Sequence, residues 1–192
     1  MSIAADSQTA RMTAEEFLAW ETEQEERHEF IDGRPQAMAG GTHAHHVMAL
    51  NIAVALRGKL DGPCTPLLER KLHTLRGNYR YPDVLVDCGK PSARDLAADD
   101  PRVVIEIVSP SNTLIEQVER LEDFQATPSI QQIVILSQTS MHGRVYTRDG
   151  AGWSASTLRG EEAKLPLGTI GCELSFAEIY QRVEFSPPAA NK

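Results

Sequence analysis

The sequence has little of what a membrane-spanning or secreted protein needs. Its longest uninterrupted apolar runs, such as 103–105 and 133–136, are only a few residues long, far below the roughly 20 that cross a bilayer. Residues 1–6 have neither a basic start nor an apolar core, which a secretory signal requires. We therefore expect no membrane span and a cytoplasmic protein.

Cysteine is also scarce. Cys64, Cys88 and Cys172 are the three in the chain, and no pair has the C-x-x-C spacing of a zinc knuckle or redox motif. Small secreted domains that depend on disulfides are much richer in cysteine. The spacing predicts three reduced cysteines without a structural role.

Basic residues are in deficit. The 19 Lys and Arg stand against 27 Asp and Glu, which gives a formal net charge of −8, whereas nucleic-acid binding depends on Lys and Arg. Six basic residues do gather between 57 and 80, and we expect them to form a local basic surface, which would suit a DNA substrate if it lies at the cleft. They are Arg57, Lys59, Arg70, Lys71, Arg76 and Arg80.

Several nucleotide and hydrolase motifs are missing. The chain contains no G-x-x-x-x-G-K-[ST] or G-x-G-x-x-G phosphate-binding loop and no G-x-S-x-G nucleophile motif. Nucleotide-driven chemistry and serine hydrolysis are therefore not expected.

A chain of 192 residues is long enough for one domain with its own core. We expect a single domain over residues 12–185, with a loose N-terminus at 1–11 and a loose tail at 186–192. The Thr13 capping box predicts a helix that begins near residue 14 and runs into the acidic 21–26 stretch. The Asp32-Gly33 dipeptide predicts a hairpin turn.

Apolar residues at helical spacing predict two longer helices. The first spans 44–60, and the second spans about 113–126, where one face should contact a sheet. The apolar residues of that second face are Leu114, Val118, Leu121 and Phe124. Strands are expected at 66–75, 83–87, 103–108, 132–136, 144–148 and 153–158. This mixture predicts an α/β (α+β) fold with a central mixed sheet covered by helices.

Glu106 is the most informative residue. It interrupts the apolar run 103–108, where burial of an unpaired carboxylate costs several kcal/mol. Strand alternation places it on one face with Val104 and Val108, so it needs a cation or an ion pair at one defined place. A structural ion pair and a functional role are equally compatible with this residue taken alone.

Asp83 follows Pro82 at the opening of the next candidate strand. Proline is suited to the first residue of a strand, so the Asp83 side chain is expected at the end of the sheet. Together with Glu106 it makes a pair of oxygen ligands suited to Mg²⁺ or Mn²⁺. Phosphoryl chemistry is the class that this pair favours, although a turn-forming Asp would have the same sequence.

The histidines at 43, 45 and 46 suggest a zinc site. No second cluster of Cys or His at ligand spacing follows them. A zinc site is therefore the less favoured alternative.

Several motifs, in this order, resemble the Uma-type family of restriction endonucleases within the PD-(D/E)XK nuclease superfamily. They are the 28–33 segment, Thr42-x-x-His45, Tyr81-Pro82-Asp83, Glu106-x-x-Ser109-Pro110, and Pro128-Ser129-Ile130. The resemblance covers roughly residues 13–180. It implies an α/β/α sandwich with a central mixed sheet and metal-dependent hydrolysis of phosphodiesters.

The resemblance also implies roles for individual residues. Asp83 and Glu106 would hold Mg²⁺ or Mn²⁺, with the carbonyl of Ile107 as a further ligand. The superfamily lysine falls on Val108, and the lysine that replaces it on the next helix in the family falls on Arg120. Arg120 can brace a phosphate but is a poor activator of water.

Three further positions match the family. Glu29 matches an additional acid that binds metal or water, although an acid in this region is more often solvated, and His45 would line the cleft. Glu116 matches a frequent Asp, but a capping box with Thr113 and an i,i+4 pair with Arg120 explain it better.

The favoured function is therefore a Mg²⁺- or Mn²⁺-dependent DNA endonuclease that acts as a homodimer, because two cuts need two sites. The first alternative is an inactive relative that binds nucleic acid or protein. The second is a phosphoesterase for small substrates, which the net charge of −8 would favour.

Overall fold

A computed structural model describes residues 11–109 and 112–185. Most of the expected loose N-terminus (residues 1–10), the expected loose tail 186–192, and residues 110 and 111 lie outside the described residues. The helices are α1 (Ala14–Glu21), α2 (His43–Lys59), α3 (Leu114–Ala126), α4 (Phe176–Ile179) and the 3-10 helix η1 (Gly168–Ile170). The strands are β1 (His28–Ile31), β2 (Arg34–Ala37), β3 (Thr65–Leu68), β4 (Leu72–His73), β5 (Tyr79–Arg80), β6 (Val84–Asp87), β7 (Pro101–Val108), β8 (Gln132–Ser137), β9 (His142–Asp149), β10 (Gly152–Arg159), β11 (Lys164–Leu167) and β12 (Cys172–Ser175).

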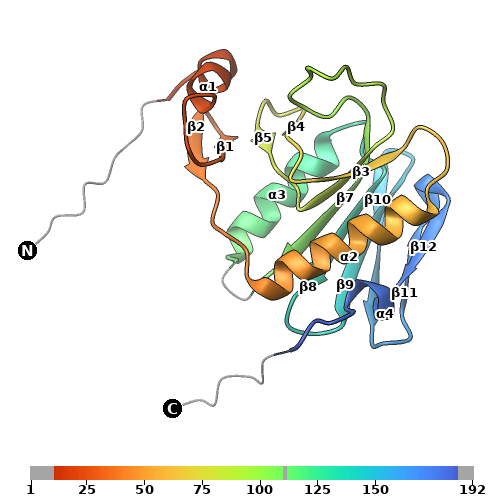
Figure 1. Ribbon diagram of the computed structural model, residues 1–192. Coiled ribbons are helices and arrows are strands. Elements are labelled where there is room, and N and C mark those ends of the chain that lie inside the picture. The colour runs from red at the N-terminus through yellow and green to blue at the C-terminus, as the bar shows by residue number, and fades with distance from the viewer. Residues whose placement is uncertain (1–10, 110–111, 186–192) are drawn as a thin grey trace, which may run out of the picture.

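A six-stranded sheet forms the centre of the molecule, in the order β10-β9-β8-β7-β6-β3 (Figure 1). Strands β7 and β8 are parallel and are connected through α3, while the other neighbours are antiparallel. A parallel pair requires such a crossover. The predicted mixed sheet is confirmed.

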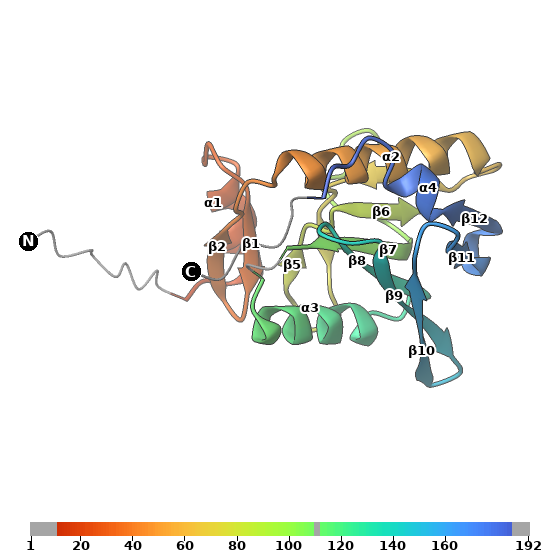
Figure 2. The same ribbon diagram turned by 90° about the horizontal axis from the view of Figure 1, so that it is seen from below.

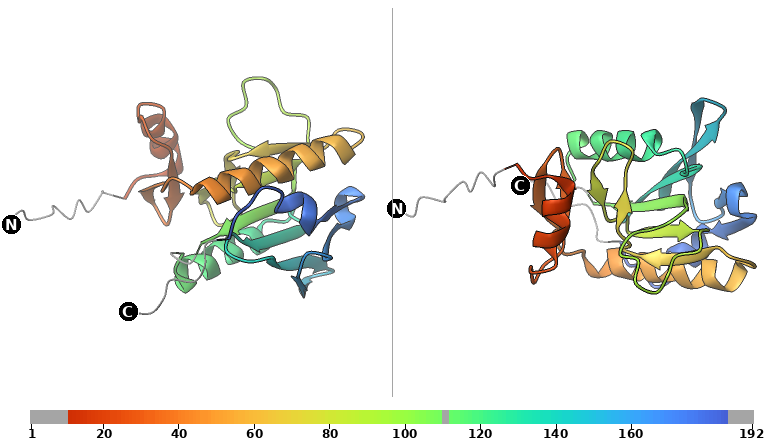
Figure 3. Two further views of the ribbon diagram at one scale, coloured as in Figure 1. Left: turned by 60° about the horizontal axis from the view of Figure 1, so that its bottom comes forward. Right: turned by 90° about the horizontal axis from the view of Figure 1, so that it is seen from above.

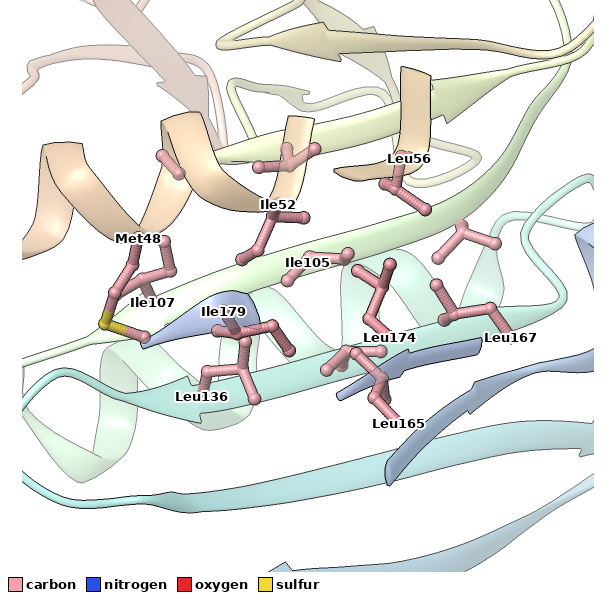
Figure 4. Close-up of a cluster of buried hydrophobic side chains, with 14 of the residues drawn as sticks. Met48, Ile52, Leu56, Ile105, Ile107, Leu136, Leu165, Leu167, Leu174 and Ile179 are labelled. Carbon is pink, nitrogen blue, oxygen red and sulfur yellow. The ribbon is translucent and has the colours of Figure 1, made fainter. Parts of the chain in front are cut away.

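Helices cover both faces of this sheet, so the predicted α/β/α sandwich is confirmed (Figure 2). On one face, Met48, Ile52 and Leu56 of α2 belong to one buried cluster with Ile105 and Ile107 of β7 (Figure 4). Each such side chain contributes about 1.5–3 kcal/mol when it is fully buried. This cluster makes α2 and β7 one rigid unit, which matters because both carry site residues.

Helix α3 covers the opposite face, but with less of its length than the sequence predicts. Phe124 is buried there among sheet residues, and Leu121 packs against them. Leu114 and Val118 are exposed instead, so that part of the prediction is wrong. The first turns of α3 line a cleft rather than the sheet.

A smaller sheet, in the order β2-β1-β5-β4, lies at one end of the central sheet together with α1 (Figure 3). Stacked rings of Phe17, Phe30 and Tyr79 form its core. The hairpin turn occurs at Asp32 and Gly33, with φ of 48° and 81°. Both angles are in the left-handed region that this dipeptide tolerates, so the predicted hairpin is confirmed.

Two predicted elements differ from the structure in their boundaries. Helix α1 ends at Glu21 and does not continue through 21–26. The expected strand 66–75 is divided into β3 and β4, since Glu69 adopts a positive φ of 44°, which no strand residue maintains. Strands β5, β11 and β12 and helices η1 and α4 were not predicted.

The expectation of three reduced cysteines is wrong. Cys64 and Cys88 form a disulfide, with a Cα–Cα distance of 3.9 Å, and Cys172 alone is free. The two residues flank the Thr65–Asp87 pair of β3 and β6, so strand pairing brings them together across 24 positions of sequence. Spacing alone could not reveal this pairing.

None of the helices among the described residues is long and apolar enough to span a membrane.

Candidate active site

A cleft of about 570 Å³ opens at the carboxyl end of β7, between the start of α2, the start of α3 and the smaller sheet. In open α/β sheets this strand end is the common place for a ligand. All five predicted site residues line the cleft, as does Ile107. The five are Glu29, His45, Asp83, Glu106 and Arg120.

Asp83 lies at the point where β6 stops pairing with β7. The backbone ladder ends at the Val84–Ile105 pair. Beyond it, Asp83 Oδ2 accepts a hydrogen bond from the Ile107 N–H at 2.6 Å. The carboxylate therefore replaces a backbone carbonyl at the end of the ladder, next to Pro82, which has no N–H to contribute.

The direction of the Ile107 carbonyl follows from the direction of its N–H. A residue in a regular strand directs its N–H and its C=O to the same side, and the Ile107 N–H faces Asp83. The next carbonyl, of Val108, faces the other neighbour and accepts from the Gln138 N–H at 3.1 Å. The Ile107 carbonyl consequently faces the side that β6 has vacated.

Glu106 is only 8% exposed. Its Oε1 accepts a hydrogen bond from Arg120 Nη1 at 3.2 Å, which is the compensation that the sequence requires. Burial raises the pKa of the Glu106 carboxyl to about 8, opposed by Arg120 and reinforced by the charges of Asp83 and Glu29. Within the described residues, Oε2 makes no hydrogen bond, so this oxygen is available to a ligand.

Glu29 is buried at the edge of the same cleft, so the expectation of a solvated acid is wrong. Its Oε1 accepts from the Tyr81 N–H at 3.0 Å, and its Oε2 accepts from Arg80 Nη1 at 3.1 Å. Arg120 Nη2 donates to the same Oε2 at 2.9 Å. Arg120 thus bridges Glu29 and Glu106, which are 77 positions apart in the sequence.

His45 lies in the first turn of α2, with its Nε2 3.1 Å from Asp83 Oδ1. The hydrogen bond with Asp83 raises the pKa of the imidazole, burial opposes this, and the charges of Asp83 and Glu106 add to it. Thr42 is the N-cap and accepts from the His45 N–H. The Thr42-x-x-His45 motif therefore both starts α2 and places His45 in the cleft.

Glu116 has the structural role that the sequence favours. It forms a capping box with Thr113 at the start of α3, and the Thr113 contacts lower the pKa of its carboxyl. Arg120 turns away from Glu116 and pairs with Glu106 and Glu29. The expected i,i+4 pair is therefore absent from the described contacts.

The basic segment does not line the cleft. Of the six basic residues in 57–80, Arg80 alone lines the described part of the cleft. Four of the others contact acids or carbonyls elsewhere: for example, Lys71 pairs with Glu21, and Arg76 with Glu122. Local acidic partners, which composition does not reveal, neutralise this segment.

The donor set suits a hard divalent cation. Asp83, Glu106 and the Ile107 carbonyl offer oxygen atoms, and Mg²⁺ usually takes one or two protein carboxylates and completes its shell with water and phosphate. No group of three or more His, Cys, Asp or Glu is placed to hold a metal ion in the described parts of the chain.

Acidic groups outnumber basic ones around the cleft. Glu29, Glu106 and the buried Asp123 pair with the guanidinium groups of Arg80 and Arg120. Arg76 also contacts Asp123 at 3.6 Å, and Asp83 pairs with His45 instead. When all four carboxyl groups are ionised and His45 is neutral, the three guanidinium groups leave one negative charge, which a cation would offset.

Sequence reasoning missed the part that Arg80 and Asp123 play at this site. Arg80 counted only as part of a basic segment, and Asp123 was not considered. A signal did exist, because Arg120 and Asp123 are three apart on a helix and so share one side of it.

The comparisons with known proteins agree with this fold. Residues 14–177 match the model of the family Uma2, described as "Putative restriction endonuclease". Two relatives from Synechocystis sp. (strain ATCC 27184 / PCC 6803 / Kazusa) are the uncharacterized proteins slr1290 and sll1609. The first is 28% identical over 91% of this chain and 94% of the relative, and the second is 25% identical over 89% and 97%.

A solved structure has the same fold. It is the crystal structure of a nuclease described as "putative" and belonging to DUF820, from Anabaena variabilis ATCC 29413. The TM-score is 0.71 at 18% identity, over 88% of this chain and 97% of the other.

Proposed function

Because this chain belongs to the Uma2 family, described as "Putative restriction endonuclease", we propose that it is a divalent-cation-dependent endonuclease that hydrolyses DNA phosphodiester bonds. One observation carries the proposal. The hydrogen bond from the Ile107 N–H to Asp83 Oδ2, at 2.6 Å, joins Asp83 to the Glu106-Ile107 segment. Two carboxylates and a free carbonyl edge thereby meet at the carboxyl end of a central strand, inside a cleft.

Asp83, Glu106 and the Ile107 carbonyl would hold Mg²⁺ or Mn²⁺. When bound, the cation polarises the phosphate and lowers the pKa of an attacking water. Hydrolysis joins the water oxygen to phosphorus and breaks the bond to the sugar oxygen, which leaves with a proton. Glu29 is the additional acid that would accept a hydrogen bond from that water.

Arg120 would stabilise the phosphate. Although burial lowers the pKa of its guanidinium, the charges of Glu106 and Glu29 hold that pKa above its usual value, so Arg120 stays charged and can bind a phosphate bidentately. His45 holds Asp83 through the contact at 3.1 Å. Its raised pKa gives it positive charge near the phosphate when it is protonated.

A second function is favoured by a specific observation. Val108 occupies the place of the superfamily lysine, and Arg120 is engaged by two carboxylates. A chain that keeps the cation site but does not activate water would be a nucleic-acid or protein-binding module. Metal binding without cleavage would distinguish this module from the nuclease.

A plasmid assay tests the proposal. The purified protein is incubated with supercoiled plasmid and with single-stranded DNA, in Mg²⁺ and in Mn²⁺, beside Asp83→Asn and the matched control Asp149→Asn. Asp149 is an exposed residue at the end of β9. We expect cleavage by the wild type and by Asp149→Asn but not by Asp83→Asn, while cleavage by Asp83→Asn would overturn the assignment.

We also propose that the active form is a homodimer, since cutting both strands needs two sites and one domain of this size offers one. Light scattering of the protein with and without DNA measures this directly. A monomer that cuts both strands at one site would contradict it.

A further inference from the structure

A buried ion pair lies behind the cleft. Arg80 on β5 and Asp123 on α3 are 3% and 1% exposed. Arg80 Nε donates to Asp123 Oδ2 at 2.7 Å, and Arg80 Nη1 donates to Glu29 Oε2 at 3.1 Å. One guanidinium group therefore joins α3, β5 and β1.

Asp123 is fixed from its other side as well. Asn78 Nδ2 lies 3.0 Å from each Asp123 carboxylate oxygen. Asn78 Oδ1 also accepts from the Asp32 N–H at 3.0 Å, which ties the β1–β2 turn to the same cluster. The carboxylate thus has little freedom to move.

The contacts continue from Asp123 to the cleft in one chain of alternating charge. Arg80 connects Asp123 to Glu29, Arg120 connects Glu29 to Glu106 with contacts of 2.9 and 3.2 Å, and the last four of these residues line the cleft. Asp123 does not line it. A residue that cannot touch a substrate thus determines the direction of residues that can.

We propose that Asp123 and Arg80 are positioning residues, which hold Glu29 and, through it, the guanidinium of Arg120 in the orientation that serves a phosphodiester in the cleft. The inference rests on the proposed nuclease function. Asp123 and Arg120 are three residues apart on α3, so the same side of the helix is anchored at one residue and directed into the cleft at the other. Outer partners of this kind typically change activity or metal affinity about 10–100-fold when they are removed.

Kinetics give the first test, with Asp123→Asn against the matched control Glu122→Gln. Both variants remove one carboxylate charge from neighbouring positions of α3. Glu122 is exposed and pairs with Arg76, whose Nε also lies 3.6 Å from Asp123 Oδ1, but Glu122 itself contacts neither Arg80 nor Glu29 in the described residues. We expect Asp123→Asn to lower kcat about 10–100-fold with KM within about twofold, because the orientation of Glu29 and Arg120 is lost. Equal losses in the two variants would overturn the proposal.

Arg80→Lys supplies a second variant with unchanged charge. A lysine ammonium cannot span two carboxylates as a planar guanidinium does, so the same loss of kcat is expected. The melting temperature of each variant shows whether it folds. If Asp123→Asn does not fold, Arg80→Lys still tests the positioning role.

Nuclear magnetic resonance gives a readout that needs neither metal nor DNA. The Nε–H signal of Arg120 is assigned by its disappearance in Arg120→Lys. We expect this signal to shift or broaden in Asp123→Asn and Arg80→Lys but not in Glu122→Gln. An unmoved signal in the first two variants would overturn the positioning role, whereas a wild type that fails to cleave DNA would overturn only the proposed function.

Discussion

Strand β6 has an aspartate at each end, and the two have very different surroundings. Asp87 accepts three backbone N–H groups from the loop that follows it, those of Gly89, Asp99 and Asp100, at 2.8–3.0 Å. Asp83 accepts one backbone N–H from β7 and contacts a histidine of α2. It also lines the cleft, which Asp87 does not.

The difference separates an aspartate that one loop surrounds from an aspartate that faces a cleft. Three N–H donors from one loop use most of the acceptor capacity of Asp87, and the Cys64–Cys88 disulfide fastens that end of the strand. Asp83 has partners from separate elements and keeps acceptor capacity toward a cavity. We infer that the number and origin of the partners, rather than burial alone, separate the two roles.

The largest effect expected from this comparison is on activity. Asp83→Asn should reduce cleavage about 1,000-fold or more, because a catalytic cation contributes several kcal/mol of transition-state stabilisation. Initial rates on supercoiled plasmid measure it, and the melting temperature should change little. Full activity in this variant would contradict the proposed difference between the roles of Asp83 and Asp87.

A change of Asp87, at the other end of β6, should affect the free energy of unfolding. Asp87→Asn should lower the free energy of unfolding by about 3 kcal/mol, since hydrogen bonds to a charged group contribute about 1.5–3 kcal/mol each and asparagine keeps one acceptor oxygen. Urea denaturation gives this value. The folded fraction should retain its specific activity, and a loss comparable to that of Asp83→Asn would break the comparison.

A change of Arg120 tests whether the cleft binds the phosphate. Arg120→Ala should lower kcat about 100-fold, which is the usual cost of removing one donor to a developing negative charge. The Mn²⁺ dissociation constant should stay within about threefold, because the oxygen ligands remain. Unchanged kinetics would remove Arg120 from the chemistry.

The affinity for Mn²⁺ should change with pH by a smaller, graded amount. Burial first, and the charges of Asp83 and Glu29 after it, raise the pKa of Glu106 to about 8, so the metal-free protein holds a proton there that a cation must displace. Mn²⁺ affinity should therefore rise up to about tenfold per pH unit until pH 8 and then level off. The same proton makes the metal-free fold lose stability as the pH rises from about 4.5 to 8. An affinity independent of pH between 6 and 8 would contradict the buried, protonated Glu106.

Local signals in the sequence predicted much of the fold. The Thr113 capping box, the Asp32-Gly33 turn and the periodicity of α2 each depend on neighbours within a few residues, and the structure confirms them. The candidate acids Asp83 and Glu106 were also found, because a carboxylate in an apolar strand is conspicuous at the level of sequence.

Features that depend on distant contacts could not be predicted. The pairing of β3 with β6 brings Cys64 to Cys88, and the smaller sheet brings Glu29 to Arg120, 91 positions away. The basic surface predicted for residues 57–80 was not found for the same reason, because the acids that pair with these residues come from other elements. A single sequence contains these residues but not their neighbours in space.

Cation binding to the metal-free protein tests the central claim most directly. The melting temperature is measured with and without Mn²⁺ for the wild type and for Glu106→Gln. We expect a clear rise for the wild type, since a ligand at 100 times its Kd adds about 2.7 kcal/mol of stability, and almost no change for Glu106→Gln. Equal shifts in the two proteins would contradict the assignment of Glu106 as a metal ligand.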